Sequence, residues 1–150
     1  MMVRAAYLEA HVLSADPLEL ICLLYQHAID QVRQARRYLA NGEIPERCQA
    51  ISKALAAIGE LDSSLDLNAG GAISSNLEQL YCYMTLRLTE ANLRRDDKLL
   101  AEVESLLETL ASGWKETRAR QAAISQAPAV AAVEAWQGTG EAGDAHAWSA

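Results

Sequence analysis

Apolar residues recur in alternating steps of three and four over four successive stretches of this chain, which is the spacing of one face of an α-helix. The first stretch begins with strong helix-start signals: Asp16 suits the N-cap, Pro17 fits the first helical position and Glu19 completes a capping box. It stops at Asn41-Gly42, a typical helix end. No segment alternates with the period of a β-strand, so the sequence predicts an all-α fold.

Further breaks divide the rest of the chain into helices. Pro45 restarts a helix, Asn68 and Gly70-Gly71 interrupt the pattern, and Asp96-Asp97 caps the last stretch. The predicted helices run over about 16–41, 44–67, 70–95 and 96–124. Because their connections are short, neighbouring helices must be antiparallel, which favours an up-down four-helix bundle. We expect residues 1–125 to form this domain, with a short docking segment at 1–15 and a flexible Ala/Gly-rich tail at 126–150.

Each predicted helix carries one stripe that we expect to face the core. The stripes are Leu18, Ile21, Tyr25, Ala28, Val32, Ala35 and Leu39; Cys48, Ile51, Leu55, Ile58 and Leu65; Ile73, Leu77, Leu80, Met84, Leu88 and Ala91; and Leu99, Val103, Leu106, Leu110 and Trp114.

Charge and composition exclude several classes of function. The formal net charge of −7 over 150 residues disfavours binding to nucleic acid or to anionic membranes. No apolar run approaches the roughly 20 residues of a membrane span, and the N-terminus does not resemble a secretory signal, so we expect a cytoplasmic protein. Cys22, Cys48 and Cys82 fall within helical patterns and are expected to be buried, reduced thiols.

Neither a catalytic nor a cofactor site is predicted. The serines lack the turn context of a nucleophile, and the three histidines have no ligand spacing with one another or with the cysteines. Gly70-Gly71 is not followed by the Gly-Lys-Ser/Thr of a phosphate-binding loop. We therefore expect a protein that is not an enzyme and binds no cofactor or metal.

Two stretches are more apolar than a small bundle requires. Residues 18–25 and 80–88 are apolar nearly all the way round, whereas about three apolar residues in seven cover a buried face. The excess forms second stripes, Leu20 with Leu24 and Cys82 with Leu86 and Leu93. Either these helices contact two neighbours each, or they border an exposed apolar groove that binds a helix or extended segment of a partner.

Several motifs resemble those of the flagellin-specific export chaperone family, FliS. They are Tyr7-x-x-x-x-Val12 with Ser14-Ala15-Asp16-Pro17-x-Glu19-Leu20 and Leu23-Leu24-Tyr25; Gly70-Gly71 with Asn76-Leu77-x-x-Leu80-Tyr81 and Arg87-Leu88-x-x-Ala91-Asn92; and Gly113-Trp114-Lys115. The resemblance spans about residues 7–118. It implies a cytoplasmic bundle that holds the C-terminal segment of flagellin, blocks its premature polymerisation and, as a complex with it, reaches the flagellar type III export gate.

The same resemblance implies residue roles by motif position. A groove for flagellin would be lined by Leu20, Leu24, Tyr25, Tyr81, Tyr83 and Leu86. Tyr7 and Val12 would belong to an N-terminal segment that covers part of the groove when flagellin is absent. Arg87 and Asn92 would hydrogen-bond either neighbouring helices or the client backbone. The alternatives left open are a chaperone or adaptor for another flagellar or secretion client, and weak homodimer formation through the groove.

Overall fold

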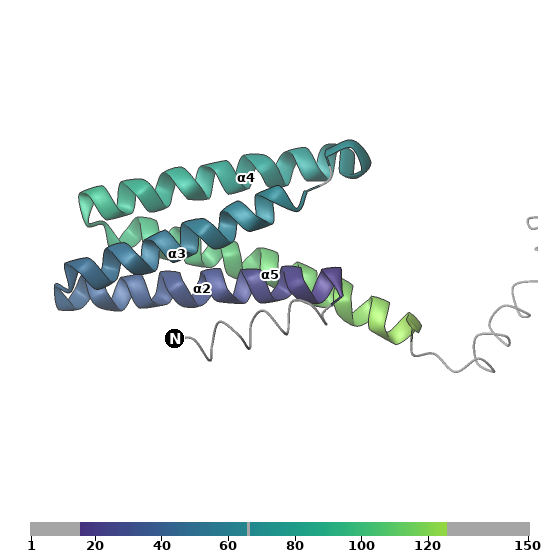
Figure 1. The fold of residues 1–150 in the computed structure, drawn as a ribbon, viewed down its shortest axis with the longest axis horizontal. Helices are drawn as coiled ribbons and strands as arrows, with labels where there is room; N and C mark the ends of the chain where they lie inside the picture. The colour runs from purple at the N-terminus through teal and green to yellow at the C-terminus, as the bar shows by residue number, and fades with distance from the viewer. Residues whose placement is uncertain (1–15, 66, 126–150) are drawn as a thin grey trace, which may run out of the picture. The chain divides into compact units, whose positions relative to one another are not determined.

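The computed structural model describes residues 16–65 and 67–125, and within them the chain is helical with no β-strand. The helices are α2 (Pro17–Asn41), α3 (Ile44–Ser63), α4 (Leu67–Arg94) and α5 (Asp97–Ser125). Successive helices run in opposite directions, which confirms the all-α, up-down bundle (Figure 1). The docking segment at 1–15 and the tail at 126–150 lie outside the described residues.

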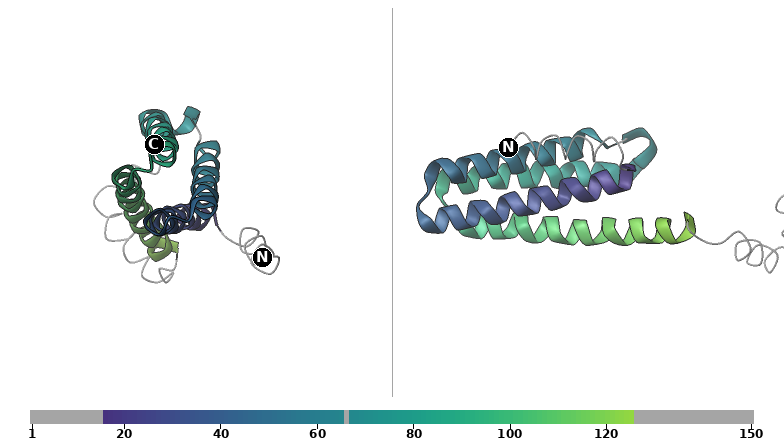
Figure 2. Two further views of the ribbon diagram at one scale, coloured as in Figure 1. Left: turned by 90° about the vertical axis from the view of Figure 1, so that its left-hand side faces the viewer. Right: turned by 60° about the horizontal axis from the view of Figure 1, so that its bottom comes forward.

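The chain divides into two compact units at Lys115. In the first unit, α2, α3, α4 and the part of α5 up to Lys115 surround a common interior, as the view along the helices shows (Figure 2). In the second unit, Glu116–Ser125 continue α5, and Glu116 forms an ion pair with Arg120.

No helix of the described residues has both the length and the apolar character that a membrane crossing requires.

The helix ends follow from local chemistry. Asp16 accepts a hydrogen bond from the Glu19 amide at 2.7 Å, as the capping-box signal predicts. Gly42 adopts the left-handed conformation (φ 73°), and its amide and the next return to the carbonyls of Leu39 and Tyr38. Asp96 caps α5 by accepting from the Lys98 amide at 2.9 Å.

The Gly70-Gly71 pair breaks α4 rather than preceding it. Helical backbone already begins at Leu67, and Gly71 interrupts it with φ 57° and ψ −131°, a conformation that side chains with a Cβ strongly disfavour. A Cβ on Gly70 would collide with the Ser74 side chain. The break therefore depends on both glycines, and α3 ends at Ser63, earlier than predicted.

The core contains residues from all four expected stripes, but the expected Leu18, Cys48 and Leu80 are half-buried and lie outside it. Its members are Tyr25, Ala28, Ile29, Val32, Ala35, Ala50, Ile51, Ala54, Ala57, Ile58, Leu61, Leu77, Tyr81, Met84, Leu88, Ala91, Leu100, Val103, Leu107 and Ala111. On α5, Val103 is buried as predicted. The other buried positions, Leu100, Leu107 and Ala111, lie one residue after the predicted Leu99, Leu106 and Leu110, which pack at the edge of the core. On α4, Ile73 was expected in the core but is 72% exposed.

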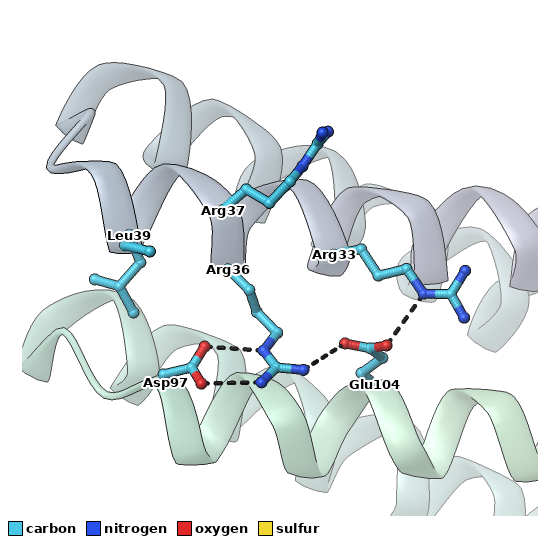
Figure 3. A pocket seen from close by; sticks show the side chains of 7 residues that line it. Arg33, Arg36, Arg37, Leu39, Asp97 and Glu104 are labelled. Atoms are coloured by element: carbon cyan, nitrogen blue, oxygen red, sulfur yellow. Dashed lines mark hydrogen bonds and ion pairs between the residues drawn. The ribbon is translucent and has the colours of Figure 1, made fainter.

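Polar contacts attach α5 to both α2 and α4. On the α2 side, Arg36 donates to both carboxylate oxygens of Asp97 at 2.9 and 3.0 Å and to Glu104 at 3.0 Å, while Arg33 donates to Glu104 at 3.1 Å (Figure 3). On the α4 side, the Tyr83 hydroxyl donates to Glu102 at 2.7 Å. These charge-assisted bonds fix how far α5 is shifted along the bundle.

Candidate functional site

The outer face of α4 carries the exposed apolar stripe that the sequence analysis raised as one alternative. Leu86 is 65% exposed, Leu93 is 82% exposed, and Cys82 is also exposed. The expectation that Cys82 is buried is therefore wrong, because its side of α4 is not covered by another helix among the described residues; Cys22 and Cys48 are half-buried. Steps of four and seven place Cys82, Leu86 and Leu93 along one line of the helix.

Within the described residues, two mainly apolar pockets border α4. One, of about 530 Å³, lies between α3 and α4 and is lined by Ile58, Gly59, Asp62, Glu78, Gln79, Tyr81, Cys82, Thr85 and Leu86. The other, of about 480 Å³, is lined by Ile21, Leu61, Ser64, Leu65, Gly70, Ile73, Ser74, Leu77, Tyr81 and Trp114. Tyr81 contributes to both pockets, so its ring forms a shared wall.

Tyr25 and Tyr81, expected as groove residues, are core residues with exposed fractions of 0% and 2%. Their hydroxyls lie 2.5 Å apart, and Trp114 Nε1 donates to the Tyr25 oxygen at 3.3 Å. Burial raises the pKa of both hydroxyls, and the hydrogen bond to Tyr25 raises that of Tyr81 further. Tyr25 lines neither apolar pocket, whereas Tyr81 lines both.

Tyr83 and Arg87 lie on the α5 side of α4, away from the α3–α4 pocket. Arg87 Nε donates to the Tyr83 hydroxyl at 3.0 Å, and its guanidinium stacks over the Tyr83 ring, 5.1 Å from the centroid. Arg87 also forms ion pairs with Glu90 and, across to α5, with Glu102. These contacts give Arg87 and Tyr83 a structural role between α4 and α5.

Asn92 connects α4 to α3. Its side-chain oxygen accepts from Arg47 Nε at 3.0 Å and from the Cys48 thiol at 3.6 Å. Arg47 is buried, so the Asn92 oxygen offsets part of the cost of removing its guanidinium from water. Of the two roles left open for Asn92, the contacts favour the one in the fold.

Among the remaining predicted residues, Leu86 lines the α3–α4 pocket directly. Leu20 and Leu24 on α2 are half-buried, and Leu24 packs against the core. Tyr7 and Val12 lie outside the described residues. The pocket-lining Ile58, Gly59, Asp62 and Glu78 were missed, since periodicity assigned Ile58 to the core alone and carried no signal for the other three.

A third pocket, of about 550 Å³, lies between α2 and α5 and is lined mostly by charged residues (Figure 3). Its carboxylates, Asp97 and Glu104, accept hydrogen bonds from Arg33 and Arg36, so the pocket contains an ion-pair contact between α2 and α5. In the part of the chain that the structure describes, no group of His, Cys, Asp and Glu side chains is arranged to hold a metal ion. What α4 presents is an exposed apolar stripe beside the α3–α4 pocket.

Comparison with known proteins identifies the family of this chain. The family model described as flagellar protein FliS matches residues 2–121. The flagellar secretion chaperone FliSB of Pseudomonas aeruginosa is 44% identical over 107 residues, which cover 71% of this chain and 85% of that protein. The flagellar secretion chaperone FliS of Salmonella typhimurium is 41% identical, over 72% of this chain and 81% of that protein. The flagellar secretion chaperone FliS of Bacillus subtilis is 32% identical, over 74% of this chain and 82% of that protein. The chain belongs to the FliS family of flagellar proteins.

Proposed function

We propose that this protein is a flagellar secretion chaperone that works in the cytoplasm and has no enzymatic activity. It binds the C-terminal segment of flagellin, prevents premature polymerisation and delivers flagellin to the type III export apparatus as a complex. The observation that carries the proposal is the exposed stripe of Cys82, Leu86 and Leu93 beside the α3–α4 pocket, in a member of this family. Soluble proteins seldom keep such a stripe unless it has a partner.

The stripe fits an amphipathic helix of the client. Its exposed positions advance by four and seven residues, the spacing with which one helix packs against another. A client helix along α4 would place one apolar side chain in the α3–α4 pocket against Ile58 and Leu86. Burying a Leu-sized side chain in this way contributes about 1.5–3 kcal/mol before the cost of ordering the client.

Tyr7 and Val12 complete the proposal. We assign them to a segment that covers part of the groove while flagellin is absent. The client and this segment would then compete for the same surface, so the apparent affinity for flagellin depends on how fully the segment occupies it.

The deciding experiment is calorimetric titration with a peptide spanning the last roughly 40 residues of the flagellin produced by the same organism, a length sufficient to cross several helices. Leu86→Glu should weaken binding at least tenfold, because it sets an unpaired charge against an apolar client surface. Ile44→Glu is the matched control: Ile44 is 48% exposed at the start of α3 and lines neither apolar pocket. Circular dichroism should show both variants folded.

Absence of binding by the unaltered protein would refute flagellin as the client and favour a different flagellar or secretion client. Equal weakening by Leu86→Glu and Ile44→Glu would move the site away from α4. Removal of residues 1–13 tests the competing segment and should tighten binding. Weaker binding with an intact fold would make that segment part of the client site.

A further inference from the structure

The α3–α4 pocket combines an apolar floor with an acidic rim. Ile58, Tyr81 and Leu86 supply apolar wall, and Gly59 leaves the α3 side open, with no atom within 4 Å of where its Cβ would stand. Asp62 of α3 and Glu78 of α4 lie at the edge of the same pocket, and both are exposed. Two helices thus bring carboxylates that are 16 residues apart in sequence to one apolar opening.

The two carboxylates of this rim have no cationic partner among the residues that the structure describes. Within the described residues, neither the Asp62 nor the Glu78 carboxylate forms a hydrogen bond or ion pair, and the pocket lining includes no Lys or Arg. The pocket between α2 and α5 differs, because its carboxylates, Asp97 and Glu104, are paired with Arg33 and Arg36. The charge of Asp62 also contributes to raising the pKa of Tyr81, after the larger effects of burial and the hydrogen bond to Tyr25.

We propose that this pocket selects a client segment that carries a basic side chain next to the apolar side chain it buries. The proposal rests on the proposed function and specifies the chemistry of the client at one position. The aliphatic stem of a Lys or Arg covers apolar wall while its charged end stays in water at the acidic rim. A neutral or acidic neighbour would gain no such contact, and an acidic one would be repelled, so the rim contributes specificity more than bulk affinity.

The test neutralises the rim without changing its shape. Asp62→Asn/Glu78→Gln is compared with Glu43→Gln/Glu60→Gln, which changes the net charge equally at two exposed carboxylates outside the pocket. Both are titrated with the flagellin C-terminal peptide at low and high salt, and urea unfolding verifies the fold. The rim variant should bind roughly threefold to thirtyfold more weakly at low salt, because it loses the interaction free energies of two exposed charge pairs. Its binding should also depend less on salt than that of the unaltered protein.

A second comparison identifies the client residue. Each Lys or Arg of the peptide is replaced by Gln in turn. One of these replacements should weaken binding to the unaltered protein, and the same replacement should not weaken binding to the rim variant. Rim-variant affinity and salt dependence equal to those of the control would overturn the inference. If Leu86→Glu abolishes binding in the same series, the proposed function stands and only the basic-residue selectivity fails; if the unaltered protein binds no flagellin peptide, both fail.

Discussion

The hydroxyl groups of Tyr25 and Tyr81 meet at 2.5 Å inside the core and join α2 to α4 across 56 positions of sequence. Their rings are tilted by 48° with centroids 6.4 Å apart, and Trp114 extends the contact to α5 through its bond to the Tyr25 oxygen. A buried polar cluster is stable only when each member keeps its partner. The cluster therefore specifies the rotation of three helices around the hydrophobic core.

The two tyrosines should not be equivalent when their hydroxyls are removed. Tyr25→Phe leaves both the Tyr81 hydroxyl and Trp114 Nε1 without this partner, so we expect it to lower the free energy of unfolding by about 1–3 kcal/mol. Tyr81→Phe leaves the Trp114–Tyr25 bond in place and should cost about 0.5–1.5 kcal/mol. Urea unfolding of the two variants measures the difference, and a larger loss for Tyr81→Phe would contradict this arrangement of the cluster.

Local signals in the sequence were sufficient to predict the bundle. Asp16 caps α2 and Gly42 ends it because their effects depend on backbone groups only a few residues away. The period of the apolar residues sets helix type for the same reason. The capping residues and helix breaks in the sequence therefore predict where the helices begin and end. The exceptions are the end of α3, which lies at Ser63, and the start of α4, which lies at Leu67.

The side of each helix that a neighbour covers depends on packing, and periodicity specifies it less well. On α5, leucines occur at both members of the adjacent pairs Leu99/Leu100 and Leu106/Leu107, so two overlapping stripes fit the helical period equally. Periodicity predicts the lining of the groove even less well. Leu86 is exposed, as the second stripe suggested, whereas Tyr25, which was expected in the groove, is in the core. A pocket rim built from residues of two helices leaves no recognisable sequence pattern along either helix.

The position of the α5 stripe gives a direct test of that packing. Leu107 is fully buried, so Leu107→Ala should lower the free energy of unfolding by about 2–5 kcal/mol through lost burial and a cavity. Leu106 packs only partly against the core, and Leu106→Ala should cost clearly less. Chemical unfolding of the pair compares the same substitution one residue apart. Equal losses of stability, or a greater loss for Leu106→Ala, would support the stripe through Leu99, Leu106 and Leu110 that periodicity suggested.

The contact between α2 and α5 should make stability depend on acid pH. Hydrogen bonds from Arg36 lower the pKa of Asp97 from its ordinary 3.8. Burial alone would raise the pKa of Glu104, but bonds from Arg36 and Arg33 outweigh it and lower that pKa from 4.5. Because both folded-state values are depressed, this stabilisation is present above about pH 4.5 and is lost as pH falls through the folded-state values.

Arg36→Gln should therefore lower the free energy of unfolding by about 1 kcal/mol at pH 7, a value limited by the exposure of the pair to solvent. The difference from the unaltered protein should shrink as the pH is lowered from 4.5. Arg37→Gln is the matched control, because Arg37 makes no ion pair within the described part of the chain (Figure 3). Urea unfolding between pH 7 and pH 3 measures both. A difference that stays constant with pH would exclude the carboxylates as its source.

The kink in α4 gives the last prediction. Gly71 holds φ 57° and ψ −131°, and an alanine there must either accept that conformation or straighten the helix. We expect Gly71→Ala to lower the free energy of unfolding by about 1–3 kcal/mol. Gly113→Ala is the opposite case: a Cβ there meets no atom within 4 Å and its backbone is helical, so alanine should stabilise α5 by about 0.5–1 kcal/mol. Because Gly70, Ile73 and Ser74 flank the kink and line the pocket shared with Trp114, straightening at Gly71 should also shift the fluorescence of Trp114. A neutral Gly71→Ala with unchanged fluorescence would show that the kink does not depend on this glycine.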